Sequence, residues 1–440
     1  MRGQFHLSGV MLCVLAGLVA LGMITIISSI LQCLYPSSLA VVTGITSRAP
    51  GSWMVLSELL PREKTDSSSR TRHMAHKRFE LLLQEVHSAV NGESLHNYCA
   101  RDNFNSEFIT AARERYQYLL PNQTQGVDPQ RIFIAINLFN SERILPNMAT
   151  QLLAFAEIIG RERVFLSIYE NGSTDNTKRI IHAFDKTLNV LGIPHNTVTD
   201  KKPRPQTYHR IEYMADLRNR ALEPLYRDAA SYSRIIFLND VIFCLPDLLE
   251  LVHQSLAYQA HLTCAEDFET HHGILAFYDT WVSRDLLGHA FKSRYQNIAD
   301  DSTALIGQLY NRPFQVQCCW NGAAVLDASV FRGNNALRFR RSSPGECSAS
   351  ECSLLCNDLW EAGYQRALVV PRVKVTYNIK TRDLLRHPSN FPRDVPFHDQ
   401  DPAKLIFKPG PATVYCNPLN SKGASVPDGT ASFIELKHTH

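Results

Sequence analysis

The sequence predicts an α/β domain built around a mainly parallel sheet. Three short apolar, β-rich runs have the composition of strands buried on both faces: 132–136, 163–168 and 234–238. Helical patterns lie between and after them, at about 142–160, 175–191, 211–227 and 246–260. Strands that alternate with helices form βαβ units, in which neighbouring strands run parallel.

Length and charge limit the classes of function. At 440 residues the chain has room for one large or two medium domains. Its net charge of +3 gives no electrostatic argument for binding a nucleic acid. We therefore expect no nucleic-acid partner.

The N-terminal segment from Leu7 to Leu34 contains no charged residue. A transmembrane helix needs about 20 residues, whereas the apolar region of a signal peptide has about 7–15. Arg2 precedes the segment and the next basic residue is Arg48, so the short end should stay cytosolic. We expect a transmembrane signal anchor with a lumenal main domain, and a cleaved signal peptide is the alternative.

The number and spacing of the eleven cysteines indicate whether the protein lies in an oxidising cellular compartment. Cys13 and Cys33 lie in the expected anchor, which leaves nine, an odd number, so at least one thiol is unpaired or pairs between chains. Cys347, Cys352 and Cys356 are closely spaced, but they lack the C-x-x-C spacing and a clustered histidine. Disulfides in an oxidising compartment are therefore favoured over zinc.

The chain divides by composition into five parts: a cytosolic tail 1–6, the anchor 7–34, a stem 35–125, a main domain 126–385 and a tail 386–440. The stem is polar and rich in Ser, Thr and Pro at first, and carries helical patterns at about 73–90 and 105–119. Asn122 begins a glycosylation sequon in a loop-like context. The final part is Pro-rich and is expected to be irregular, wrapping the domain or disordered.

Polar loops follow the predicted strands, where an open parallel sheet binds ligands. One of them, "YENGSTDNT", runs from Tyr169 to Thr177. Its glycine permits a tight turn and either Ser173 or Asp175 can cap the next helix, which leaves Glu170 and Asn171 facing a cleft. A capped helix with nothing bound is the alternative.

Another such loop is "FLNDVIF", residues 237–243. A carboxylate among apolar residues, here Asp240, is costly unless it is paired or bound to a metal. Hard oxygen ligands suit Mn²⁺ or Mg²⁺, which can bridge a carboxylate to a diphosphate. A solvated turn aspartate is the alternative. The literal Asp-x-Asp at 399–401 lies in the Pro-rich tail without a preceding strand, so we reject it.

Three motifs in order, "YENGSTDNT", "LRNRALEPL" (217–225) and "IIFLND" (235–240), resemble the nucleotide-sugar half of GT-A glycosyltransferases. The resemblance implies one GT-A-like catalytic domain whose strand end carries a D-x-D metal motif. This chain has one carboxylate there, so either Asn239 or Asp240 could take the metal role. The residues we assign to the donor site are Glu170, Asn171, Asp175, Arg218, Asn219, Trp320 and Asn321. Arg218 could bind phosphate or form a structural ion pair.

The second half contains "CAEDF" (264–268), "FYDTWVSRDLLG" (277–288), "CCWNGAAVLDASVF" (318–331), "ECSLLCNDLW" (351–360) and "VVPRVKVTYN" (369–378). This series resembles the fungal capsule-associated α-1,3-mannosyltransferase family from about 130 to 380. Glu266 departs from the family, whose members usually carry an uncharged residue there. The resemblance implies a Golgi type II membrane enzyme that transfers mannose from GDP-mannose to a mannoside hydroxyl with retention.

Carboxylates that bind sugar hydroxyls are the expected catalytic tools. We assign Asp267, Glu351 and Asp358 to catalysis, with Asp267 or Glu351 as the nucleophile if a covalent intermediate forms. Two other functions compete: an inverting transferase that uses another nucleotide sugar, and a non-catalytic Golgi subunit. Because the metal motif contains a single carboxylate, the non-catalytic Golgi subunit remains an alternative.

Overall fold

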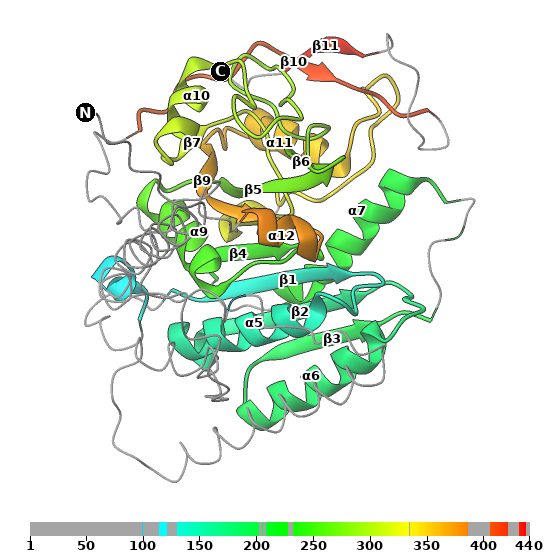
Figure 1. Ribbon diagram of the computed structural model, residues 1–440. Helices are drawn as coiled ribbons and strands as arrows, with labels where there is room; N and C mark the ends of the chain where they lie inside the picture. The colour runs from blue at the N-terminus through cyan, green and yellow to red at the C-terminus, as the bar shows by residue number, and fades with distance from the viewer. Residues whose placement is uncertain are drawn as a thin grey trace, which may run out of the picture. The chain divides into compact units, whose positions relative to one another are not determined.

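The computed structural model describes residues 99, 114–120, 130–201, 205, 208–227, 232–333, 335–385, 405–420 and 431–436 (Figure 1). The expected cytosolic tail, the anchor, the helix at 73–90 and Asn122 lie outside these residues. Among the residues that are described, none of the helices combines the length and the apolar character that a membrane crossing requires.

A nine-stranded sheet forms the centre of the domain, in the order β3-β2-β1-β4-β8-β5-β9-β7, with β6 paired to β5. The strands are β1 (Ile132–Leu138), β2 (Val164–Glu170), β3 (His195–Thr199), β4 (Arg234–Leu238), β5 (Leu262–His271), β6 (Ile274–Phe277), β7 (Phe314–Gln315), β8 (Ala323–Asp327) and β9 (Ala367–Val375). A separate two-stranded sheet pairs β10 (Thr413–Cys416) with β11 (Ser432–Glu435).

Strands β3, β2, β1 and β4 pair in parallel, as do β5 and β9. Strand β8 is antiparallel to both β4 and β5, so those two point the same way. The carboxyl ends of β1–β5 therefore face one side, toward α7 in Figure 1. The domain is a mixed α/β fold with a central sheet, as predicted, in which β6, β7 and β8 run against the majority.

The helices are η1 (Gln117–Leu119), α5 (Leu145–Ile159), η3 (Arg161–Arg163), α6 (Thr177–Leu191), α7 (Arg210–Ala221), α8 (Glu223–Arg227), α9 (Leu245–Ala257), α10 (Ser302–Leu309), η4 (Ala328–Phe331), α11 (Glu351–Glu361) and α12 (Ile379–Leu385). The single helix expected at 211–227 is divided into α7 and α8. Pro224 explains the division, because it has no N–H to continue the helical hydrogen bonds.

Both faces of the sheet are buried. On β1, Ile132, Ile134 and Ile136 belong to a core that includes apolar residues of α5, α6 and α9. The alternate residues Phe133 and Ala135 belong to a second core with α7 and α11. This alternation follows from the period of two along a strand. It explains why the strand is apolar at consecutive positions.

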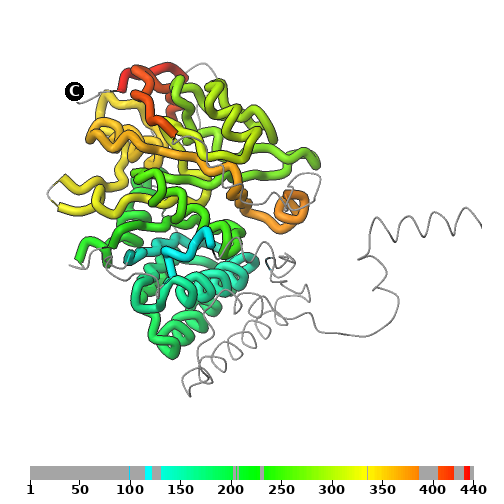
Figure 2. Tube along the Cα trace, turned by 90° about the vertical axis from the view of Figure 1, so that its left-hand side faces the viewer, coloured from blue at the N-terminus to red at the C-terminus, as the bar shows by residue number. Residues whose placement is uncertain are grey.

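The C-terminal segment differs from the expected irregular tail. Its two strands, β10 and β11, form a hairpin that lies beside the upper part of the domain in Figure 2. Cys347–Cys416 ties β10 to the segment before α11, and the Tyr415 N–H donates to the Gly288 carbonyl at 2.8 Å. A Cβ on Gly288 would lie 2.1 Å from the Thr413 carbonyl oxygen, so this contact requires glycine. The strands were missed because each spans only four residues.

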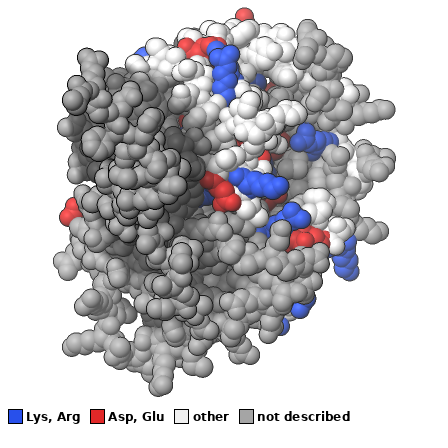
Figure 3. Space-filling model, in the orientation of Figure 1, with Lys and Arg blue, Asp and Glu red and all other residues white. Residues whose placement is uncertain are grey.

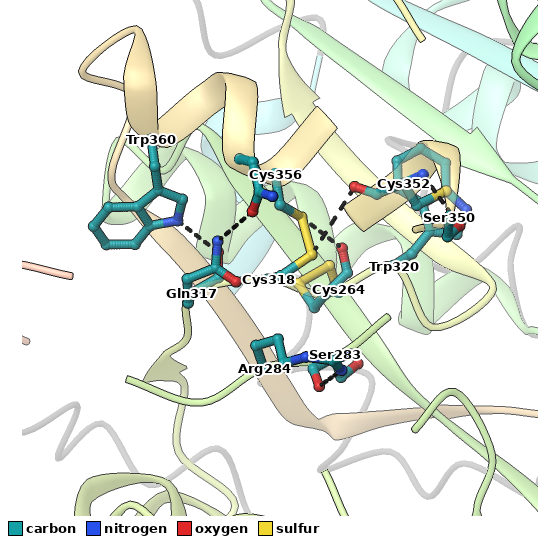
Figure 4. Close-up of a disulfide and its surroundings, with 12 residues drawn as sticks. Cys264, Ser283, Arg284, Gln317, Cys318, Trp320, Ser350, Cys352, Cys356 and Trp360 are labelled. Carbon is teal, nitrogen blue, oxygen red and sulfur yellow. Dashed lines mark hydrogen bonds between the residues drawn. A yellow bond between two sulfur atoms is a disulfide. The ribbon is translucent and has the colours of Figure 1, made fainter. Parts of the chain in front are cut away.

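Four disulfides join the described cysteines: Cys99–Cys244, Cys264–Cys319, Cys318–Cys356 and Cys347–Cys416. Figure 4 shows Cys318–Cys356, which links α11 to the segment before β8. Cys352, one turn before Cys356, is buried and forms no disulfide. The preference for disulfides and the prediction of an odd thiol are confirmed.

Candidate functional site

The loops after β1 and β2 are joined by side-chain to backbone hydrogen bonds. The Asn140 N–H donates to Ser173 Oγ at 2.9 Å, and the Glu142 N–H donates to Asp175 Oδ2 at 3.1 Å. Asp175 Oδ1 accepts from the Thr177 N–H at 2.9 Å, at the start of α6. Both carboxylate oxygens of Asp175 are thus used within the loops. Asp175 therefore shapes the predicted donor site rather than offering it a ligand atom.

Glu170 ends β2 and is fully buried. Its Oε1 accepts from the Ser173 N–H, and its Oε2 has no hydrogen-bond partner within the described part of the chain. Lys178 Nζ lies 3.9 Å from that oxygen. The Asn171 N–H donates to the Leu138 carbonyl at 3.1 Å, which fixes the loop to the end of β1. Glu170 therefore keeps one buried oxygen that is near Lys178 but accepts no hydrogen bond from the described residues.

Arg218 on α7 is the centre of a buried polar group. Its Nε donates to Glu351 Oε1 at 2.9 Å and its Nη1 donates to Asn239 Oδ1 at 3.2 Å. Trp320 Nε1 also donates to Asn239 Oδ1 at 3.3 Å, and Asn239 Nδ2 donates to the Tyr377 hydroxyl at 3.1 Å. Both ends of the Asn239 amide are thus engaged. Of the two alternatives for Arg218, the structure contains the ion pair, with each side chain 5% exposed.

Asp240 follows Asn239 at the end of β4 and is partly buried. Burial raises the pKa of its carboxyl, whereas a hydrogen bond with Ser141 and the charge of Arg218 lower that pKa. A bound cation would offset the same desolvation. Because the Asn239 oxygen already accepts from two donors, Asp240 is the better candidate for a metal ligand.

Trp320 and Asn219, both assigned to the donor site, are engaged with the protein. Trp320 is 2% exposed, and its ring packs 5.2 Å from that of Phe237 and 5.4 Å from that of Phe339. Asn219 donates through Nδ2 to the Phe339 carbonyl at 2.7 Å and accepts its N–H at 3.1 Å. These contacts hold the segment around Phe339 against α7. The Trp320 ring is therefore not placed to stack on a sugar.

Asn321, also assigned to the donor site, lies in a left-handed turn with φ of 53° before β8. It is fully buried, accepts from Ser283 Oγ at 2.7 Å and donates to the Ala265 carbonyl at 2.7 Å. The next residue, Gly322, accepts from the Asn239 N–H at 2.9 Å. The turn therefore connects the end of β5 with the end of β4.

Two carboxyl groups lie together beyond that turn. Asp267 on β5 is fully buried; its Oδ1 accepts from the Asp279 N–H at 3.2 Å, and its Oδ2 has no hydrogen-bond partner among the described residues. Asp279 is partly exposed and accepts from the Asn321 N–H at 3.2 Å. Burial, and then the charge of Asp279, raise the pKa of Asp267 well above its usual value. Burial also raises the pKa of Asp279, to about 6.

Tyr377 connects this carboxyl pair with the end of β4. Its hydroxyl accepts from Asn239, and burial raises its pKa, followed by the charges of Asp267 and Asp279. Glu269 accepts the Tyr377 N–H at 3.1 Å and so fixes the backbone there. The ends of β4, β5 and β9 therefore form one polar cluster.

A family model described as "Cryptococcal mannosyltransferase 1" matches residues 131–358, just over half of the chain. The chain belongs to this family. Its sequence is 30% identical over 291 residues to "Alpha-1,3-mannosyltransferase CMT1" of Cryptococcus neoformans var. neoformans serotype D. The match covers 61% of this chain and 61% of that relative.

Solved structures of other proteins are less similar. A mannosyltransferase, PcManGT from Pyrobaculum calidifontis in complex with GDP-Man and Mn²⁺, has 13% identity and a TM-score of 0.36, covering 61% of this chain and 65% of that one. S. aureus TarS 1-349 has 12% identity and a TM-score of 0.32, covering 56% and 60%. At these values the likeness supports no statement about donor or metal.

For this member of the cryptococcal mannosyltransferase 1 family, the three predicted catalytic carboxylates have different surroundings. Glu351 binds Arg218 through Oε1 and accepts from Ser350 Oγ at 3.2 Å through Oε2. Asp358 accepts two hydrogen bonds from Arg340, at 2.9 and 2.7 Å. Only Asp267 keeps an oxygen without a hydrogen-bond partner in the described chain.

The predicted site residues did not include Tyr377 or Asp279. Tyr377 lies two residues after β9, which is parallel to β5. Ligands bind beyond the carboxyl ends of parallel strands, and this rule identified the loops after β2 and β4. The same rule would therefore have identified Tyr377. Asp279 lies beyond the short strand β6, so the rule could not place it.

A second group of possible metal ligands consists of Asp285, His289 and Asp300, whose ligand atoms are within 4.8 Å of one another. The Asp285 carboxylate already accepts four backbone N–H groups, those of Leu287, His289, Asp300 and Asp301, at 2.9 to 3.1 Å. Because these bonds use its lone pairs, Asp285 organises the loop, and we assign no metal there.

Charges of both signs lie beside one another on the face seen in Figure 3, among uncharged side chains. This arrangement agrees with the nearly balanced net charge. The described part of this face therefore carries no large patch of one sign.

Proposed function

We propose that this protein is a glycosyltransferase with a GT-A-type catalytic domain, which moves mannose from GDP-mannose to a hydroxyl of a mannoside acceptor. The observation that carries the proposal is the polar cluster at the ends of β4, β5 and β9 in a member of this family. The α-1,3 linkage comes from the family resemblance and from the name of the curated relative, and retention of configuration comes from the resemblance alone.

Each group has a role in this proposal. Glu170 Oε2, without a hydrogen-bond partner in the described chain, accepts an N–H of the nucleoside base. Asp240 would hold Mn²⁺ or Mg²⁺, and the bound ion would supply positive charge to neutralise the diphosphate leaving group. Asn239, held by Arg218 and Trp320, fixes the backbone next to Asp240.

The state of Asp267 bears on the mechanism. Burial, and then the charge of Asp279, raise the pKa of the Asp267 carboxyl well above its usual value, which disfavours the charged carboxylate that a nucleophile needs. Glu351 is held in an ion pair with Arg218. Both facts favour deprotonation of the acceptor hydroxyl by the leaving diphosphate over a covalent intermediate.

We place the catalytic domain in the Golgi lumen, anchored by the apolar segment at 7–34. Four disulfides support an oxidising compartment. The apolar segment and the family resemblance support a type II membrane protein.

A second candidate is an inverting transferase, because partly exposed Asp279 could act as a general base at neutral pH. NMR of the product distinguishes the two: an α-linked mannoside from GDP-α-mannose supports retention, and a β-linked one supports inversion.

The test incubates the purified full-length protein with labelled GDP-mannose, Mn²⁺ and α-mannobiose. We expect transfer that stops when the metal is chelated, and a loss of about 10²- to 10³-fold in kcat for Asp240→Asn. The matched control is Asp216→Asn, which removes an exposed carboxylate that pairs with Arg220. Full activity of Asp240→Asn with metal would refute the metal assignment, and no transfer to any mannoside would favour a non-catalytic subunit.

A further inference from the structure

The turn after β6 places a tyrosine ring and a carboxyl group side by side. Tyr278 is 50% exposed, and the next residue, Asp279, is partly exposed. The Thr280 N–H donates to the Tyr278 carbonyl at 2.8 Å, and the Ser283 N–H donates to the Asp279 carbonyl at 3.2 Å. The turn is thus held by its own backbone.

Neighbouring elements fix the turn from both sides. Trp281 donates through Nε1 to the Asn417 carbonyl at 2.9 Å, which attaches the turn to the C-terminal segment. The backbone N–H groups of Tyr278 and Asp279 both donate to Asp267, at 3.0 and 3.2 Å. A rigid turn loses little conformational entropy when it binds a ligand.

A chain of contacts between aromatic and polar side chains leads from this turn toward the proposed metal ligand. The Tyr278 ring packs on that of Tyr377, with centroids 5.2 Å apart and planes at 55°. The Tyr377 hydroxyl in turn binds Asn239, the neighbour of Asp240. The exposed Tyr278 ring is therefore two contacts away from the end of β4.

A second observation indicates that a polar ligand belongs here. The buried carboxyl group of Asp267 faces the turn, since its Oδ1 accepts the Asp279 N–H, yet its Oδ2 has no hydrogen-bond partner in the described chain. Buried polar atoms are normally satisfied. A ligand with hydroxyl groups would supply the missing partner.

We propose that Tyr278 and Asp279 bind the acceptor sugar. The exposed ring packs against the apolar C–H face of a pyranose, and the carboxylate accepts hydrogen bonds from its hydroxyls. This inference rests on the proposed function, because it gives the acceptor its place beside the donor. It requires a pyranoside with free adjacent hydroxyls.

The experiment compares Tyr278→Ala, Tyr278→Phe and Asp279→Asn in the full-length protein. With saturating GDP-mannose and varied α-mannobiose, Tyr278→Ala should raise the acceptor KM about tenfold, because it removes the ring. Tyr278→Phe keeps the ring and should change that KM less than about twofold. Asp279→Asn should also raise it about tenfold, and the KM for GDP-mannose should stay unchanged in all three variants.

An unchanged acceptor KM in both Tyr278→Ala and Asp279→Asn would overturn the inference, and so would an equal rise in the KM of donor and acceptor. Saturation-transfer NMR without donor measures the binding of α-mannobiose directly. This measurement tests the acceptor site separately from the proposed function. A wild-type protein that binds α-mannobiose through Tyr278 but transfers no mannose would refute only the function. A protein that neither binds nor transfers would refute both.

Discussion

The buried ion pair between Arg218 and Glu351 allows a quantitative prediction. Glu351→Gln removes a charge from a side chain that is 5% exposed, facing a guanidinium that is also 5% exposed. Breaking a buried pair by neutralising one partner costs about 3–5 kcal/mol, because the other charge stays buried. Arg218 keeps its bond to Asn239 and its place 4.6 Å from the Trp320 ring centroid, so we expect the lower end, about 3 kcal/mol.

That loss corresponds to a fall in Tm of about 6–12 °C, at about 2–4 °C per kcal/mol for a domain of this size. The assay is urea and thermal unfolding, followed by near-UV circular dichroism with the disulfides intact. The double variant Arg218→Met/Glu351→Leu removes both charges and should regain part of the stability, giving a coupling of at least about 2 kcal/mol.

Two results would contradict this reasoning. A loss below about 1 kcal/mol for Glu351→Gln would mean that the pair is not the buried contact described, and so would additive effects in the double variant. The same variant also tests catalysis by Glu351. A covalent nucleophile would lose roughly 10⁴-fold or more in kcat, whereas we expect a loss of less than about tenfold below the Tm.

Three further predictions concern pH, glycosylation and the C-terminal hairpin. Because the pKa values of Asp267 and Asp279 are raised in the folded protein, the folded state binds more protons than the unfolded state from about pH 4 to 6, and stability falls as pH rises there. Asp267→Asn should make the urea midpoint of unfolding depend less on pH across that window. Equal pH dependence of the midpoint in the variant and the wild type would refute this. Asn171 begins a second glycosylation sequon, Asn-Gly-Ser at 171–173, and peptide mapping should find it without a glycan because Ser173 is buried; a glycan there in active enzyme would refute the donor loop. Replacing Cys347 and Cys416 by serine should destabilise the protein by about 2–5 kcal/mol, and an unchanged Tm would mean that the hairpin is not held by this bond.

The strands that could be predicted are those with strong local signals. β4 has the predicted bounds, and β1 and β2 start within one residue of the predicted positions. β8 was not predicted as a strand, although its residues lay in a quoted motif. It runs antiparallel between β4 and β5. No local sequence pattern specifies which strands a segment will pair with.

The candidate site was predictable in the same way. The polar loops after β2 and β4 follow from their place after apolar strands, so Glu170 and Asp240 could be selected from the sequence. The engagement of Trp320 and Asn219 with the protein could not, because their partners Asn239 and Phe339 are distant in the chain. Residue type alone cannot separate an aromatic ring that stacks on a ligand from one that fills a core.

The α/β class, the family and the odd number of cysteines outside the apolar segment follow from the sequence alone, because these depend on local patterns, motif order and counts. The three-dimensional structure was needed to find that Arg218 binds Glu351, that Cys352 remains a thiol, and that Asp267 and Asp279 lie together. Those outcomes depend on which distant segments meet. Burial then makes a charge, or an oxygen without a hydrogen-bond donor, unfavourable in free energy, whereas the same group would be solvated in water.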